Sequence, residues 1–113
     1  MRIEIKGRNV AVGDELRERI EKRFAKVARQ VSPLARMEVE LSEERNPSIR
    51  AAHVAEATLY LKGVTLRARD SAESMTRAVN LVEEEICRQV KRHRDKRRRR
   101  RETAKAQPHV AAP

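Results

Sequence analysis

Residues 55–69 read AEATLYLKGVTLRAR, and this stretch decides the fold. Apolar and polar side chains alternate on both sides of the pair Lys62-Gly63. The apolar members are Ala55, Ala57, Leu59 and Leu61 before the pair and Val64, Leu66 and Ala68 after it. A period of two puts every second side chain on the same face of a strand, and a glycine between two such runs favours a tight reversal. The stretch therefore predicts an antiparallel hairpin of two half-buried strands.

Two shorter alternating runs precede this hairpin. Residues 2–6 place Ile3 and Ile5 on one side, and residues 37–41 do the same with Met37, Val39 and Leu41. Gly7-Arg8-Asn9 breaks the first run, and residues 43–50, which include Asn46-Pro47-Ser48, predict a loop after the second. The sequence thus predicts four strands.

Two segments carry apolar residues at steps of three and four, which is typical of a helix with one buried stripe. The first begins at Gly13-Asp14-Glu15 and ends at Ser32-Pro33, with the stripe Leu16, Ile20, Phe24, Val27 and Val31. The second has the stripe Met75, Val79, Val82, Ile86 and Val90. Asp70-Ser71-Ala72-Glu73 resembles a capping signal before it, although Ser71 or Ser74 could equally be the cap. Nothing breaks this helix until well past Arg101, and we expect a helix from about residue 74 to 101, about 42 Å long.

The order β-α-β-β-β-α predicts an α+β fold. Two amphipathic helices each need an apolar surface, and a four-stranded sheet with one apolar face supplies it. We therefore expect both helices on one face and a wet opposite face bearing Glu40, Tyr60, Arg67 and Arg69. Residues 1–101 are expected to form one domain, with residues 102–113 as a disordered tail or the start of a linker.

The charge of the chain is concentrated near its C-terminus. The 113 residues carry 27 Lys and Arg against 17 Asp and Glu, a net charge of +10. Residues 88–113 alone hold 11 basic residues against Asp95 and Glu102, a net charge of +9. Such a cationic end attracts a polyanion, either nucleic acid or an acidic membrane face.

Other classes of function find little support in the sequence. The first residues alternate apolar and charged side chains, unlike a signal peptide, and no apolar run could cross a bilayer, so we expect a cytoplasmic protein. His53, His93 and His109 are isolated, and Cys87 lies beside a buried stripe as a small hydrophobe. Glu83-Glu84-Glu85 point in different directions and predict a solvated face. We expect no catalytic site, metal, cofactor or small-molecule substrate.

Basic side chains remain as the candidate site. On the first helix Arg19, Lys22, Lys26 and Arg29 form a ridge, which Glu15, Glu18 and Glu21 partly neutralise. On the last helix Asp95 is the only acid expected to relieve the cations, which are Arg88, Lys91, Arg92, Arg94, Lys96 and Arg97 to Arg101. Residues 91–101 lack the apolar side chains of a membrane-surface helix, and Tyr60 is the only aromatic ring expected outside the core. Phosphate and shape recognition of structured RNA therefore fits best.

Several segments in order resemble the ribosome hibernation-promoting factor family, which includes the ribosome-associated inhibitors of the protein Y type. They are Gly7-Arg8-Asn9-Val10 with Leu16-Arg17, Ala57-Thr58-Leu59-Tyr60-Leu61-Lys62-Gly63, Met75 with Ala78-Val79, and residues 88–96 (RQVKRHRDK). The resemblance covers about residues 1–96. It departs at Thr76 and Asn80, where relatives commonly have tyrosine and aspartate, and at Arg67 and Arg69, where many carry histidine or an acid.

The resemblance implies a fold similar to the double-stranded-RNA-binding domain and a place in the small-subunit channel for messenger and transfer RNA. It implies a translation regulator that keeps ribosomes inactive during stress or stationary phase, with the small subunit and its rRNA as partners. Lys22, Lys26, Arg88, Lys91, Arg92 and Lys96 match family positions that face rRNA, and the charge pattern adds Arg29 and Arg94. Long relatives carry a second domain that pairs ribosomes. The sequence is compatible both with a short member of the family and with the N-terminal domain of a long one. The alternative is a general double-stranded RNA- or DNA-binding protein.

Overall fold

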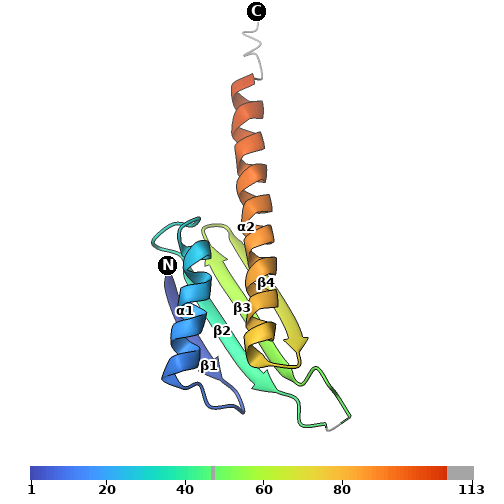
Figure 1. The fold of residues 1–113 in the computed structure, drawn as a ribbon. Helices are drawn as coiled ribbons and strands as arrows, with labels where there is room; N and C mark the ends of the chain where they lie inside the picture. The colour runs from blue at the N-terminus through green and yellow to red at the C-terminus, as the bar shows by residue number, and fades with distance from the viewer. Residues whose placement is uncertain (47, 107–113) are drawn as a thin grey trace, which may run out of the picture.

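A computed structural model describes residues 1–46 and 48–106. Its elements are β1 (Arg2–Gly7), α1 (Asp14–Ala28), β2 (Arg36–Glu43), β3 (His53–Leu61), β4 (Val64–Ala72) and α2 (Met75–Ala106). The predicted α+β class and the order β-α-β-β-β-α are confirmed, and α2 extends well beyond the sheet (Figure 1). The expected likeness to the double-stranded-RNA-binding domain stays a prediction.

The four strands form one sheet in the order β1-β2-β3-β4. β1 runs parallel to β2, and the other neighbours are antiparallel. α1 connects the parallel pair, because parallel strands need a crossover to return the chain to the same end of the sheet. In the predicted hairpin Leu61 pairs with Val64 across Lys62-Gly63. Gly63 has φ 79°, a value that favours glycine at the third position of a turn.

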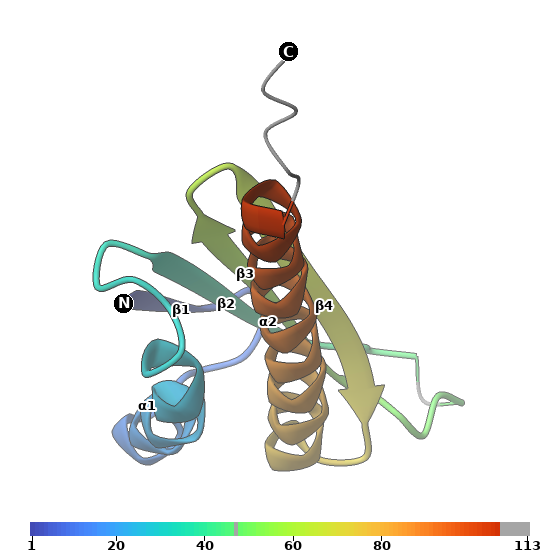
Figure 2. The same cartoon turned by 90° about the horizontal axis from the view of Figure 1, so that it is seen from above.

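Both helices cover the same face of the sheet, as Figures 1 and 2 show. α1 buries Ile20, Phe24 and Val27. Opposite them, β2 and β3 bury every second residue, with Met37, Val39, Leu41, Ala55, Ala57 and Leu59 all at most 1% exposed. α2 adds Ala78, Val79, Val82, Ile86 and Val90. The predicted stripes thus meet in one core, with Met75, Leu16 and Val31 packed at its margin.

The boundaries of the helices differ from the prediction for local reasons. α1 ends at Ala28, three residues before Val31, the last residue of the predicted stripe. The chain turns more tightly there, because Gln30 N–H donates to the Val27 carbonyl. α2 begins at Met75, and Ser74 is its cap, because Ser74 Oγ accepts from Arg77 N–H at 3.1 Å. Asp70, Ser71 and Ala72 instead continue β4, where they pair with residues 53–55 of β3.

The predicted end of the last helix near Arg101 is wrong. α2 continues to Ala106, since residues 102–106 (ETAKA) contain no helix breaker and Glu102 pairs with Arg98 one turn back, at 3.6 Å. The part of the expected disordered tail that spans 102–106 is therefore helical, and residues 107–113 lie outside the described residues. Val90 is the last buried residue of α2 in the described range. The 16 residues after it, which we call the overhang, extend about 24 Å.

The loop after β1 is fixed by two side-chain features. A Cβ on Gly7 would lie 2.1 Å from the Val10 carbonyl oxygen, so the backbone can approach this closely only at a glycine. The Asn9 side chain then donates to the Glu43 carbonyl and accepts from the Glu43 N–H, both at 2.7 Å. These bonds hold the loop against the end of β2 and so position the start of α1.

Candidate nucleic-acid interface

Three exposed cations of the predicted ridge are Lys22 and Lys26 on α1 and Arg29, the residue directly after α1. No ion pair within 4.0 Å involves them among the residues that the structure describes. Arg19, the fourth member of the predicted ridge, pairs with Glu15 at 3.8 Å and donates to Thr76 Oγ1 of α2 at 2.9 Å. Arg19 therefore joins the two helices, whereas the other three cations are available to a ligand.

The predicted cations of α2 form two rows. Arg88, Arg92 and Lys96 recur every four residues and share one row, whereas Lys91 and Arg94 begin a second. All five are exposed. Arg88 lies on the packed part of the helix, and the other four lie on the overhang beyond Val90. The eight predicted site residues therefore divide between the packed helices and the overhang.

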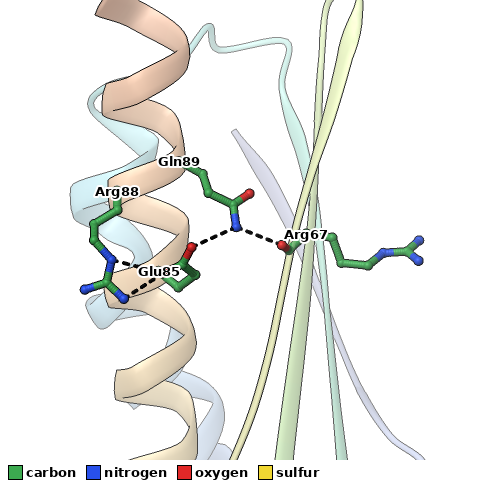
Figure 3. Close-up of polar contacts among 4 residues, drawn as sticks. All are labelled: Arg67, Glu85, Arg88 and Gln89. Atoms are coloured by element: carbon green, nitrogen blue, oxygen red, sulfur yellow. Dashed lines mark hydrogen bonds and ion pairs between the residues drawn. The ribbon is translucent and has the colours of Figure 1, made fainter.

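Arg88 has an acidic partner that the sequence interpretation overlooked. Its Nη2 and Nε lie 2.6 and 3.0 Å from Glu85 Oε2, one helical turn back (Figure 3). Gln89 donates to Glu85 Oε1 and to the Arg67 carbonyl of β4, whose own side chain extends away from α2. The hydrogen bond from Arg88 lowers the pKa of Glu85 most, and the hydrogen bond from Gln89 lowers it further. The expectation that Asp95 alone relieves these cations is wrong, because a helix brings residues three and four apart together.

A partly buried ion pair links the two helices. Arg23 Nε donates to Glu83 Oε2 at 3.1 Å, and Arg23 also lies 3.6 Å from Glu84. The Glu83 side chain is only 3% exposed, so the predicted solvated face is wrong for this residue. Cys87 Sγ donates to the other Glu83 oxygen at 3.3 Å. Burial, and then the Glu83 carboxylate, raise the pKa of the thiol to about 11, which keeps it protonated.

The open face of the sheet carries a mixture of charges. The Arg36 guanidinium lies 4.5 Å from the centre of the Tyr60 ring, and Tyr60 O–H donates to Glu38 at 3.3 Å. Arg67 lies 4.0 Å from Glu56 on the neighbouring strand. Because Arg36 covers one side of the Tyr60 ring, the ring is a poor stacking platform. Of the predicted wet face, Glu40, Arg67 and Arg69 are exposed, whereas Tyr60 is half-buried and Thr58 is only 6% exposed.

A recess of about 530 Å³ was missed by the sequence interpretation. It lies under the start of the overhang, against the loop after α1 and the β3–β4 turn. It is lined by Gln30, Val31, Ser32, Leu61, Lys62, Val90, His93, Arg94, Asp95, Arg97, Arg98 and Arg101. The signal was present in the sequence, since His93, Arg97 and Arg101 continue the spacing of Ile86 and Val90.

Two other kinds of site are absent from residues 1–46 and 48–106. No three histidine, cysteine or acidic side chains gather there in a way that could hold a metal ion. No helix in this part of the chain is long and apolar enough to span a bilayer.

The fold and its exposed cations define a small α+β domain with a long, exposed basic helix. Residues 3–98 match the family model described as Sigma 54 modulation protein / S30EA ribosomal protein, and the chain belongs to this family. The family resemblance found in the sequence is thereby confirmed.

Named relatives agree with this assignment. The chain is 30% identical to a ribosome hibernation promotion factor of Picosynechococcus over 85% of its own length, but spans only half of that protein. It is 30% identical to a ribosome hibernation promoting factor of Acinetobacter guillouiae, covering 83% of this chain and 88% of the relative. For the Escherichia coli factor the identity is 28%, with 85% and 96% covered.

Solved structures show the same fold. The Thermus thermophilus protein Y N-terminal domain superposes with a TM-score of 0.70 at 26% identity, covering 82% of this chain and 99% of that domain. A ribosomal subunit interface protein of Coxiella burnetii gives a TM-score of 0.68 at 19% identity, covering 84% and 99%.

Proposed function

We propose that this protein is a ribosome hibernation factor that docks on the small subunit in the cytoplasm. It occupies the path of messenger and transfer RNA and so keeps the ribosome inactive. The observation that carries the proposal is the exposed basic surface of α2, which continues about 24 Å past the core. The chain also belongs to a family in which relatives are named as hibernation factors. Family membership favours the ribosome over general duplex binding, the alternative considered from the sequence.

The side chains support recognition of phosphate more than of base sequence. The exposed cations, which have long and flexible stems, are Lys22 and Lys26 on α1, Arg29 directly after it, and Lys91, Arg92, Arg94 and Lys96 on α2. Of the two aromatic rings, Phe24 is buried and Tyr60 is covered on one side by Arg36. Each phosphate contact releases condensed counterions, so affinity should fall steeply with salt. A bound domain then acts by exclusion, and no bond needs to form or break.

The core makes the basic surface rigid where it leaves the sheet. Ile86 and Val90 are at most 2% exposed, and Arg23 joins α1 to α2 through Glu83. The rows of cations therefore approach RNA already ordered, which lowers the entropy lost on binding. The proposed binding unit is the packed body together with the overhang.

Co-sedimentation with separated ribosomal subunits tests this proposal. We expect the protein to pellet with small subunits and whole ribosomes, and only weakly with large subunits, at near-physiological salt. Equal pelleting with both isolated subunits would contradict site-specific docking. Equal binding to an unrelated RNA duplex of similar length would instead support a general duplex-binding protein.

A further inference from the structure

The recess under the overhang has walls of two different kinds. Val31 and Leu61 are half-buried and Val90 is 2% exposed, and together they supply an apolar floor. The opposite wall is the overhang, which contributes Arg94, Arg97 and Arg101. A space of about 530 Å³ falls within the usual range for sites that hold a small organic group.

The basic wall is the continuation of the buried stripe of α2. Val82, Ile86 and Val90 face the sheet, and the positions that follow at the same helical spacing are His93, Arg97 and Arg101. The helix therefore changes from apolar to cationic on one face, at the point where the sheet ends. Arg98 is engaged by Glu102, and Asp95 also lines the recess. The other four cations of the lining, Lys62, Arg94, Arg97 and Arg101, outnumber this one acid and leave the recess strongly positive.

These surfaces fit one particular chemistry, a flat and weakly polar ring attached to a phosphate. The ring would lie on the apolar floor against the His93 imidazole, since histidine is among the side chains that stack on unpaired bases. The phosphate would face Arg94, Arg97 and Arg101. A paired base cannot reach the floor, because in a duplex the ring is stacked inside and only the backbone is presented.

We infer that the recess binds one unpaired nucleotide of an RNA that the overhang contacts through phosphates. The inference rests on the proposed RNA binding and adds a site that prefers bulged or looped RNA to a perfect duplex. Arg94 lines the recess, and Lys91 lies one helical turn before it on the same side of the overhang. An RNA that contacts these two cations can therefore also place a nucleotide in the recess.

Two RNA hairpins that differ in one nucleotide test the inference. One carries a single bulged 2-aminopurine, and the other carries the same base paired, both with a terminal fluorescein for anisotropy. The recess variant is Arg97→Ala/Arg101→Ala. The matched control is Arg99→Ala/Arg100→Ala, which removes the same charge from the same turns at positions that do not line the recess. His93→Ala tests the stacking wall, and circular dichroism checks that each variant keeps its helix.

We expect the protein to prefer the bulged hairpin by at least about fivefold, since stacking of one base on a protein ring is typically worth that much or more. The recess variant and His93→Ala should bring the ratio of the two affinities towards one. The control should weaken both complexes and keep the ratio.

Three outcomes would overturn the inference. An equal affinity of the unaltered protein for both hairpins would overturn the recess site while leaving RNA binding intact. If neither hairpin binds while the protein still pellets with small subunits, the recess site is overturned and docking on the ribosome stands. If free adenosine monophosphate shifts the methyl signals of Val31 and Leu61 while the hairpins bind equally, the recess takes a free nucleotide and its assignment to RNA is wrong.

Discussion

The guanidinium of Arg23 in α1 donates to the buried carboxylate of Glu83 in α2 over 3.1 Å. The two residues stand 60 positions apart in the sequence, and each belongs to one of the two basic helices. A carboxylate that is 3% exposed needs a partner, because an unpaired buried charge is costly. The pair therefore fixes the cations of α1 relative to those of α2.

Removal of Arg23 should destabilise the fold. In Arg23→Ala the Glu83 carboxylate keeps its burial but loses its cation, and we expect the free energy of unfolding to fall by about 3 kcal/mol, at the low end for a buried pair because Arg23 is partly exposed. Urea unfolding followed by circular dichroism measures the loss. The control is Arg17→Ala, which removes an exposed arginine of the same helix. Equal losses in the two variants would show that the ion pair has no structural role.

The thiol of Cys87 should lose its proton only at high pH. Burial and the Glu83 carboxylate raise its pKa from the ordinary value near 9 to about 11. The folded state then holds this proton more tightly than the unfolded state, so the stability it contributes is complete below pH 9 and is lost as the pH rises towards 11. The rate of alkylation by iodoacetamide should show a midpoint near pH 11 in the folded protein and near 9 in urea. A midpoint near 9 in both states would contradict the contact with Glu83.

The overhang should contribute more to ribosome binding than α1 does. We expect Lys91→Ala/Arg92→Ala/Arg94→Ala to weaken binding more than Lys22→Ala/Lys26→Ala/Arg29→Ala, although each variant removes three charges. The remaining arginines 97–101 reinforce the field near the first set, whereas Glu18 and Glu21 stand near the second. Each lost phosphate contact should reduce the slope of log affinity against log salt by about 0.7 to 0.9. An overhang variant with unchanged affinity and slope would show that these charges do not touch RNA.

Occupancy should compete with the substrates of translation. Added protein should lower the yield of a cell-free translation reaction, and messenger RNA with initiator transfer RNA should displace it from small subunits. The reason is steric, since the proposed site lies on their path. Translation that continues undiminished on ribosomes shown to be saturated would refute exclusion as the mechanism.

The fold was predictable because its signals are local. The alternation around Lys62-Gly63 and the stripe from Met75 to Val90 each arise within one element, and the core forms where those faces meet. The end of α2 was misplaced because composition was given more weight than helix propensity. Residues 102–106 have the small and charged side chains that are typical of a tail. Glu102 nevertheless pairs with Arg98 one turn back, which continues the helix.

The candidate site was only partly predictable, because much of it depends on distant contacts. The exposure of Lys22 and Lys91 follows from the sequence, because both residues lie outside the apolar stripes of their helices. The burial of Glu83 could not be seen among three consecutive acids, since its partner Arg23 comes from the other helix. The recess likewise needs Val31, Leu61 and Val90 from three separate segments. The Glu85–Arg88 pair was in reach of the sequence, at a spacing of three.

The place of α2 as the last of the six described elements governs when the domain can fold during its own synthesis. The sheet is complete at Ala72, but the apolar face over β3 and β4 stays uncovered until Val82, Ile86 and Val90 have been translated. A nascent chain therefore remains unfolded while its first strands leave the exit tunnel, since half a core cannot offset the entropy of ordering the chain. The overhang is translated last of all the described residues. A nascent chain whose translation has not passed Val90 thus lacks both the cover of its sheet and the overhang.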